Sequence, residues 1–266
     1  RAAKALGIPT VLGVGSWDHL TTKGLIHEAP HRVLVWNEFQ KREAGELHGV
    51  PPGDVTVTGA QAYDHWFAQQ PRTAREAFCG RVGLPSDRPI LLYLCSSPFI
   101  TPYEVGFVRR WIGAVRSSPD AALRRASILI RPHPQNAAQW KEFDATALEG
   151  VGIWPPAGAN PVDADARADY YDSMFHSVAM VGINTSALIE SGIVGRPVYT
   201  VLAEEFAGQQ EGTLHFQHLK NANGGLLHVG TTLEEHLEQL AAALSGAPDP
   251  AKSRAFVEAF VRPHGL

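Results

Sequence analysis

The chain has 266 residues, of which 44% are hydrophobic and 19% are charged, so it can bury a sizeable core and is not expected to be disordered. Its 27 acidic and 23 basic residues leave a net charge of −4, which gives no general electrostatic reason to expect nucleic acid or an anionic membrane as partner. The two cysteines, Cys79 and Cys95, form no CxxC pair, and no apolar run approaches the roughly 20 residues of a membrane helix. We therefore expect a protein of the reducing cytoplasm.

Short apolar segments alternate with amphipathic segments along the chain. Several apolar segments are continuously hydrophobic, as strands covered on both faces should be. The pattern predicts an α/β fold with a mostly parallel sheet flanked by helices. Strands are predicted at residues 9–14, 32–36, 55–58, 89–94, 127–130, 151–154, 178–183 and 197–202, and helices at residues 38–48, 103–116, 136–142, 168–176, 185–194, 233–244 and 251–261.

A polar stretch at residues 69–88 precedes the strongest predicted strand, and we place a domain boundary near it. Residues 1–66 hold too few elements for an independent nucleotide-binding domain, so we expect them to be the end of an N-terminal domain whose beginning is missing. Residues 67–266 then form the second domain. Four aromatic residues are predicted to pack at the junction: Trp36, Phe39, Trp66 and Phe67.

The polar loop at residues 15–24, GSWDHLTTKG, directly follows a predicted strand. Asp18 and His19 are candidates for a catalytic acid–base pair at a cleft. Adjacent side chains often diverge, however, so the alternative is a connecting loop with Trp17 packed at a domain interface. The sequence leaves both interpretations open.

The segment ILIRPHPQN, residues 128–136, runs from a buried strand into a polar turn. Its two prolines hold the turn extended, so Arg131 and His133 emerge at the carboxyl end of the strand. There they can bind a diphosphate or a sugar hydroxyl. The alternative is that Arg131 makes a structural ion pair and His133 satisfies backbone carbonyls.

The segment VAMVGINTSALIESG, residues 178–192, is a second passage from strand to helix. Asn184 is expected to cap a helix that begins with Thr185 and Ser186, whose free N–H groups favour a phosphate. Glu190 lies about 6 Å further along the same face, where its carboxylate can accept hydrogen bonds from ribose hydroxyls. The alternative is that Asn184 caps a core-packing helix and Glu190 faces solvent.

Ligands of α/β sheets bind outside the carboxyl ends of the strands, where these two turns are expected to meet. With His133, Asn184, Thr185, Ser186 and Glu190, the chain resembles the C-terminal, Rossmann-like half of GT-B glycosyltransferases. It is similar to lipid-A-disaccharide synthase, to capsule and teichoic-acid polymer transferases and to non-hydrolysing UDP-N-acetylglucosamine 2-epimerases. The segment RVLVWNEFQKREAGELHGVPPGDVTVTGA resembles their crossover between domains, which implies that Gly59 and Ala60 lie at the cleft, with Gln61 and Asp64 close by.

The resemblance also implies that the glycine-rich segment 206–227 faces the donor sugar. Its candidates for sugar contacts are Gln209, Gln210, Glu211, Thr213, His215 and His218. His215 and His218 are three residues apart and are an alternative metal pair, but no third ligand stands at a recognisable spacing. We expect no metal and no cofactor.

By resemblance, the chain is expected to transfer a sugar from a UDP-, CMP- or CDP-linked donor to a glycan or lipid acceptor, with Arg131 and His133 stabilising the leaving phosphate. Three alternatives stay open: a nucleotide-sugar 2-epimerase, a CDP-glycerol-type polymer transferase, and a fragment that binds nucleotide sugar without turnover. Peripheral association with the inner face of the membrane is a further expectation. The chain contains no GxxxxGK[ST], GxSxG or complete GxGxxG motif, which disfavours kinase, hydrolase and dehydrogenase functions.

Overall fold

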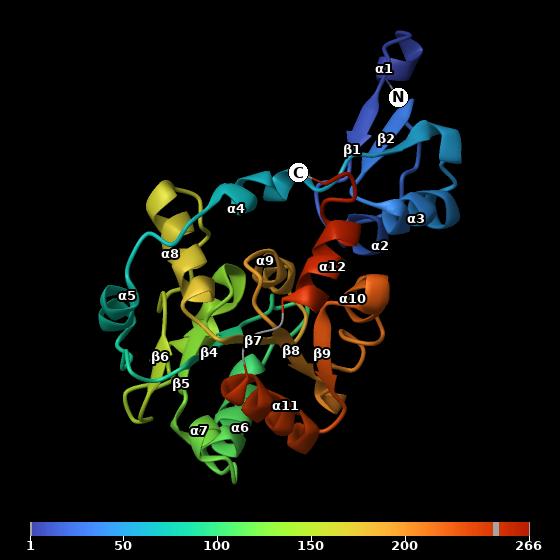
Figure 1. The fold of residues 1–266 in the computed structure, drawn as a ribbon. Coiled ribbons are helices and arrows are strands. Elements are labelled where there is room, and N and C mark those ends of the chain that lie inside the picture. Colours follow the sequence, from blue (N-terminus) through green and yellow to red (C-terminus); the bar gives the residue numbers. More distant parts are fainter. Residues whose placement is uncertain (1, 247–249, 266) are drawn as a thin grey trace.

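The computed structural model describes residues 2–246 and 250–265, and within them the strands form two separate parallel sheets (Figure 1). The small sheet has the order β1-β2-β3, with β1 at Val11–Gly13, β2 at Arg32–Val35 and β3 at Val55–Val57. The large sheet has the order β6-β5-β4-β7-β8-β9. Its strands are β4 (Ile90–Leu94), β5 (Ser127–Arg131), β6 (Val151–Ile153), β7 (Ala179–Gly182), β8 (Val198–Val201) and β9 (Leu227–Gly230).

The strand order of the large sheet reverses beside β4. The chain runs outward from β4 through β5 to β6, then returns to the other side of β4 to form β7, β8 and β9. In register, Leu94 at the end of β4 lies between Arg131 of β5 and Gly182 of β7. A reversal of this kind opens a crevice at the carboxyl ends of the neighbouring strands, which is where open α/β sheets bind ligands.

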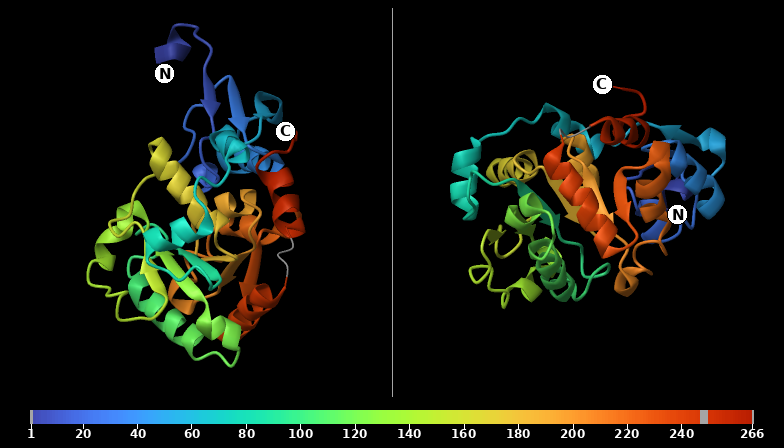
Figure 2. Two further views of the ribbon diagram at one scale, coloured as in Figure 1. Left: turned by 60° about the vertical axis from the view of Figure 1, so that its left-hand side comes forward. Right: turned by 60° about the horizontal axis from the view of Figure 1, so that its bottom comes forward.

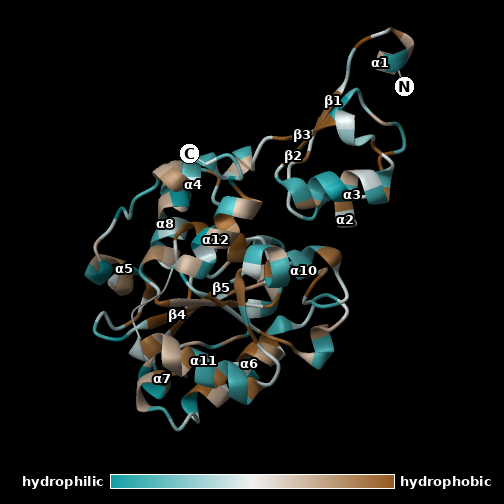
Figure 3. Ribbon diagram, turned by 45° about the vertical axis from the view of Figure 1, so that its right-hand side comes forward, coloured by the Kyte–Doolittle hydropathy of each residue, from teal (hydrophilic) through white to brown (hydrophobic). Residues whose placement is uncertain are grey.

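Helices cover both faces of the large sheet (Figures 1 and 3). Side chains alternate across the strands, so Leu92 of β4 packs in one apolar cluster and Leu91 packs in the other. One face is covered by α6 (Glu104–Arg116), α7 (Ala121–Arg125) and α11 (Leu233–Ser245), and the other by α5 (Arg75–Val82), α8 (Ala164–Phe175), α9 (Ala187–Ile193), α10 (Leu214–Asn221) and α12 (Ala251–Phe260).

The small sheet packs against α3 (Glu38–His48), which has clear start and stop signals. The Asn37 side chain accepts a hydrogen bond from the Gln40 N–H at the start, and Gly49 ends the helix in the left-handed conformation, with φ of 67°. The other helices of the first part are short: α1 (Ala2–Ala5), α2 (His19–Thr22) and α4 (Asp64–Ala68), which leads towards the large sheet.

The end of α12 returns to the small sheet and ties the two parts together (Figure 2). The Ala60 N–H donates to the Val261 carbonyl at 2.8 Å, and Asn37 Nδ2 donates to the Phe260 carbonyl at 2.7 Å. Gly59 has φ of 81°, and a side chain there would meet the Val261 carbonyl at 3.3 Å. This crossing is therefore fixed by backbone contacts as well as by apolar packing.

All eight predicted strands are present, but β9 and α10 were not predicted. Helix α10 falls inside the segment 206–227, which was expected to be a loop that faces the donor sugar. The predicted helix at 136–142 is instead a 3-10 helix, Pro134–Trp140. Trp36 and Trp66 are buried in an apolar cluster against which Phe39 and Phe67 pack, which confirms the prediction of an aromatic junction. The boundary between residues 66 and 67 falls inside α4 and stays a prediction. Within the described ranges, no helix combines the length and apolarity that crossing a bilayer requires.

Candidate functional site

A pocket of about 220 Å³ lies at the carboxyl ends of β4, β5 and β7, beside the reversal of strand order, and we call it the strand-end pocket. Five of the predicted site residues line it, and they come from two turns separated by about 50 residues in the chain. They are Arg131, His133, Thr185, Ser186 and Glu190. Residues 159–161, between β6 and α8, close another side. The two turns therefore meet at one pocket, as predicted from the sequence.

Glu190, on α9, is held by Tyr170 of α8, whose hydroxyl donates a hydrogen bond to Glu190 Oε2. Burial raises the pKa of Glu190 to about 7, although the hydrogen bond from Tyr170 and the positive charge of Arg131 act in the opposite direction. Glu190 is partly buried and lines the pocket beside Tyr170, so it does not stand free on the surface as the alternative interpretation held. Its carboxyl group can change charge near neutral pH inside the pocket.

Arg131 is 7% exposed and is anchored in the protein. Its Nη1 contacts Asp169 Oδ2 at 3.3 Å and the Ser173 hydroxyl at 2.7 Å, and the guanidinium group lies 4.6 Å from the ring centre of Tyr170. The structural ion pair considered as the alternative role is therefore present. Because both polar contacts use Nη1, the Nε and Nη2 groups remain for a ligand in the pocket that Arg131 lines.

His133 begins the 3-10 helix, where its Nδ1 accepts a hydrogen bond from the Gln135 N–H at 3.2 Å. Burial lowers the pKa of the imidazole, which favours its neutral form. With Nδ1 acting as acceptor, the proton of the neutral ring is on Nε2. His133 can therefore donate from Nε2 to an anionic oxygen.

The prediction that Asn184 caps a helix is wrong. Helix α9 begins at Ala187 after Ser186, and the side chain of Asn184 is buried beneath the turn. Its Nδ2 donates to the Gln209 carbonyl at 2.6 Å and to His215 Nε2 at 3.2 Å. Asn184 therefore fixes the loop after β8 instead of lining the strand-end pocket.

The residues predicted to contact a sugar after β8 have structural contacts. Gln210 is fully buried: its Oε1 accepts from the Ala203 N–H at 3.1 Å and its Nε2 donates to the Val201 carbonyl at 3.0 Å. Glu211 forms an ion pair with Lys220. Gln209 contributes its backbone carbonyl to Asn184. None of the three lines the strand-end pocket, because the loop turns back on its own strand.

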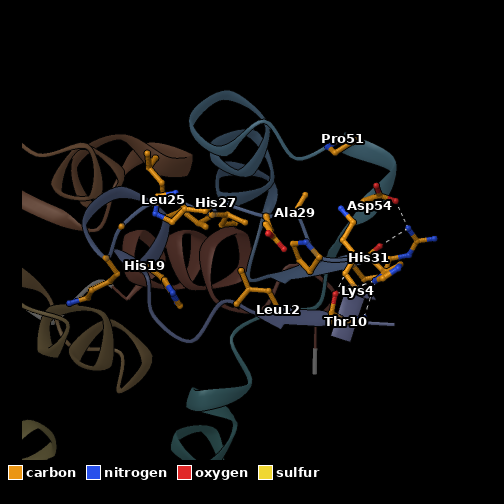
Figure 4. A pocket seen from close by; sticks show the side chains of 17 residues that line it. Lys4, Thr10, Leu12, His19, Leu25, His27, Ala29, His31, Pro51 and Asp54 are labelled. Carbon is orange, nitrogen blue, oxygen red and sulfur yellow. Dashed lines mark hydrogen bonds and ion pairs between the residues drawn. The ribbon is translucent and has the colours of Figure 1, made fainter. Parts of the chain in front are cut away.

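Asp18 and His19 do not form an acid–base pair. The Asp18 carboxylate accepts from Ser16 and Thr22 and contacts Lys23 at 3.2 Å, and although burial alone would raise its pKa, these partners lower it overall. His19 points into a different pocket, of about 930 Å³, beside the small sheet (Figure 4). Trp17 is buried and packs edge-on against His215 at 4.7 Å, as the connecting-loop alternative proposed.

His215 and His218 diverge as well. His215 is buried beside Asn184, whereas His218 Nε2 contacts Glu43 Oε1 of α3 at 2.5 Å. Over the residues that the structure describes, no group of three or more His, Cys, Asp or Glu side chains is arranged to hold a metal ion. Through Trp17 and Glu43, these two histidines connect α10 to the part of the chain that carries the small sheet.

Two tyrosines near the pocket were not identified from the sequence. Tyr170 lines the pocket and contacts both Glu190 and Arg131. Tyr63 is buried at the crossover, and its pKa is raised well above its usual value by burial and by the nearby carboxylates of Glu190 and Asp18. Tyr170 lies in α8 and Tyr63 in a short 3-10 helix, and a tyrosine in a helix carries no local signal of function, since core packing is its usual role.

No protein-family model matches the chain, and no curated protein matches it in sequence. Among solved structures, UDP-GlcNAc 2-epimerase from Methanocaldococcus jannaschii, in complex with UDP-GlcNAc and UDP, is similar with a TM-score of 0.60 and 13% identity, over 96% of this chain and 70% of that chain. WaaG, a glycosyltransferase involved in lipopolysaccharide biosynthesis, is similar with a TM-score of 0.53 and 16% identity, over 93% and 70%. For the wall teichoic acid polymerase TagF the TM-score is 0.48 at 13% identity, over 87% and 53%.

The similarities to the epimerase and to WaaG show that the chain has the GT-B fold, with parallel sheets flanked by helices, as the sequence resemblance implied. At these identities the comparison concerns the fold and not the reaction. The chain spans about half the length of the polymerase and 70% of the epimerase and of WaaG.

Proposed function

We propose that the strand-end pocket binds a nucleoside diphosphate sugar and that the protein transfers the sugar to an acceptor. The observation that carries this proposal is the convergence of Arg131, His133, Ser186 and Glu190 around one pocket at the reversal of strand order. Guanidinium, imidazole and hydroxyl groups donate hydrogen bonds to phosphate oxygens, and a carboxylate accepts them from ribose hydroxyls. The pocket thus offers hydrogen-bond donors for the phosphates and an acceptor for the ribose of one nucleotide.

In the proposed reaction, breaking the bond between sugar and phosphate leaves negative charge on the diphosphate. The free N–H groups of Arg131 and the Nε2–H of His133 would stabilise that charge, since donors positioned in advance act where charge develops. Glu190, oriented by Tyr170, would hold the ribose. Asp18 is held by Ser16, Thr22 and Lys23 instead of His19, so no residue is assigned here as the general base that takes the acceptor's proton.

A second candidate function is 2-epimerisation of a nucleotide sugar. It is favoured by the similarity to an epimerase whose structure contains UDP-GlcNAc and UDP. Both candidates need the same donor pocket and differ in the fate of the sugar. Product analysis without any added acceptor separates them, because epimerisation requires none.

We also propose that further protein outside these residues completes the acceptor side of the cleft. Val11, on edge strand β1, is 62% exposed, and Leu6 and Ile8 before it are exposed too. Exposed apolar side chains beside a free strand edge are typical of a sheet that continues. This agrees with the 70% of the epimerase and WaaG chains that the present chain spans.

The proposal is tested by calorimetric titration with UDP, CDP, GDP and ADP and their sugar conjugates, with and without Mg²⁺. We expect one nucleotide to bind selectively, and Glu190→Gln to weaken its binding by about 1 to 3 kcal/mol through loss of charge-assisted hydrogen bonds. Glu238→Gln, an exposed carboxylate of α11 on the opposite face, is the matched control. Equal affinity of the wild type and Glu190→Gln would remove Glu190 from the site, and no binding of any nucleotide would overturn the proposed function.

A further inference from the structure

Two aromatic side chains stand in solvent on the loop that joins β4 to α6. Phe99 and Tyr103 are each 85% exposed. Among the large apolar side chains of residues 2–246 and 250–265 they are the most exposed. Large aromatic side chains are usually buried, because burying them removes much apolar surface from water. Aromatic side chains that stay exposed are common on binding surfaces.

The backbone of this loop is held rigidly from beneath. Buried Glu104 accepts a hydrogen bond from the Ser96 N–H at 3.0 Å. Buried Asn136 donates from Nδ2 to the Ser96 carbonyl at 3.2 Å and to the Thr101 carbonyl at 2.9 Å. The two rings are thus displayed on an ordered support, so a ligand that stacks on them pays little entropy for ordering the loop.

The loop begins at the strand-end pocket. Leu94 and Cys95, which precede it, line that pocket. The Ser96 hydroxyl accepts a hydrogen bond from the Asn184 N–H at 3.3 Å, directly before Thr185 and Ser186. The aromatic loop and the pocket therefore share one strand end.

The composition of the loop indicates what kind of ligand it suits. Residues 96–108, SSPFITPYEVGFV, contain no lysine or arginine, and their one charged residue, Glu104, is buried. Anionic membrane surfaces and nucleic acids are bound through cationic side chains. The nearest ones along the chain, Arg109 and Arg110, are already engaged, by the ring of Phe143 and by the carboxylate of Glu205. Two exposed aromatic faces, one of which carries the Tyr103 hydroxyl, suit the apolar faces and hydroxyls of neutral sugar rings.

We propose that Phe99 and Tyr103 form a stacking platform for the sugar rings of a neutral glycan acceptor. This inference rests on the proposed function, because it gives the donor pocket an acceptor on the adjoining loop. It narrows the acceptor to an uncharged glycan. It also assigns acceptor binding in part to the large sheet's own domain.

The test titrates maltotetraose, cellotetraose and chitotetraose into the protein without nucleotide, followed by saturation-transfer NMR and calorimetry. We expect at least one tetrasaccharide to bind, and the double variant Phe99→Ala/Tyr103→Ala to lose at least tenfold in affinity. Leu25→Ala removes a 65% exposed side chain from the small-sheet region and should leave the tetrasaccharide affinity unchanged. Because the rings are exposed, the double variant should keep the melting temperature of the wild type.

Nucleotide titration of the same variants separates the two proposals. Unchanged nucleotide affinity together with lost glycan affinity supports the platform, and absence of nucleotide binding in every variant counts against the proposed function alone. Failure of all three tetrasaccharides to bind, or equal binding by the double variant, would overturn the platform. Cosedimentation with phosphatidylglycerol vesicles that the double variant abolishes would also overturn it, by assigning the rings to a membrane surface.

Discussion

The hydroxyl of Tyr170 donates a hydrogen bond to Glu190, and the same tyrosine ring lies against the guanidinium group of Arg131. One side chain of α8 thereby orients the acidic and the basic group of the strand-end pocket. Neither contact is local in sequence. Tyr170 is 20 residues from Glu190, and Arg131 lies at the end of β5, before β6 and α8. The charge state of Glu190 is the property that this arrangement controls most directly.

Nucleotide affinity is expected to depend on pH through Glu190. Its pKa is about 7, and ribose binding needs the ionised carboxylate, so affinity should rise with pH and be up to about tenfold weaker at pH 6 than at pH 8. Tyr170→Phe removes a hydrogen bond that lowers this pKa, so the midpoint should move to higher pH. Titration calorimetry between pH 5.5 and 8.5 measures both effects, and an affinity that is constant over this range would refute the role of Glu190.

Arg131→Met is expected to destabilise the fold. It leaves the mostly buried carboxylate of Asp169 without one of its partners, although Arg81 and Trp154 still contact it, so we expect a loss of about 2 kcal/mol in the free energy of unfolding. Arg32→Met breaks the exposed Arg32–Asp54 pair and should cost less than about 1 kcal/mol. Urea unfolding of both variants compares the two losses. Equal losses would contradict a structural role for the Arg131 ion pair.

Gln210→Ala should reduce stability and leave nucleotide affinity unchanged. The substitution leaves the Ala203 N–H and the Val201 carbonyl without their side-chain partner in a buried place, which costs about 1 to 3 kcal/mol. Glu211→Gln, at the next residue, breaks an exposed ion pair with Lys220, serves as the control and should have little effect on either property. A selective loss of nucleotide-sugar affinity in Gln210→Ala would restore this residue to the site.

His236 is expected to make the protein less stable in mild acid. It is fully buried, accepts a hydrogen bond from Trp111 Nε1 at 3.1 Å, and burial lowers its pKa to about 4. Between this value and the unfolded pKa of about 6.5, the unfolded chain binds more protons, so the free energy of unfolding falls as the pH falls through this window, by up to about 3 kcal/mol. His236→Gln should flatten the dependence in urea unfolding between pH 7 and 5, whereas His27→Gln, at an exposed position, should keep it.

Glu104 should act with the opposite sign. Burial raises its pKa to about 8, so between about pH 4.5 and 8 the folded protein binds more protons than the unfolded chain, and stability falls as the pH rises. Glu104→Gln keeps an oxygen that can accept from the Ser96 N–H and removes the titration. We expect the variant to gain stability relative to wild type as the pH rises from 6 to 8. A constant difference over this range, in thermal unfolding, would show that Glu104 does not titrate there.

The local pattern of the sequence was sufficient for the large elements and for the pocket's two turns. Apolar runs predicted eight strands, several of them continuous because both faces of a parallel sheet are buried. The carboxyl ends of parallel strands share one edge of the sheet, so the turn with Arg131 and His133 was expected to meet the turn that leads to Glu190, and the two turns do meet. β9 escaped detection because His228 and Gly230 interrupt its apolar pattern.

Tertiary structure alone decided what each polar side chain contacts. Asn184 has the chemistry of a helix cap, yet it lies beneath the turn and contacts His215, 31 residues away. Gln210 has the chemistry of a sugar-binding amide, yet both polar groups of its side chain are bonded to the backbone of Val201 and Ala203 at the end of β8. Buried polar atoms must find partners, and which groups become partners depends on how the chain packs, as it does for the contact between Asn184 and His215. The sequence therefore determined which chemistry reaches the sheet edge, and the packing of α8, α9 and the loop after β8 determined which groups remain free for a ligand.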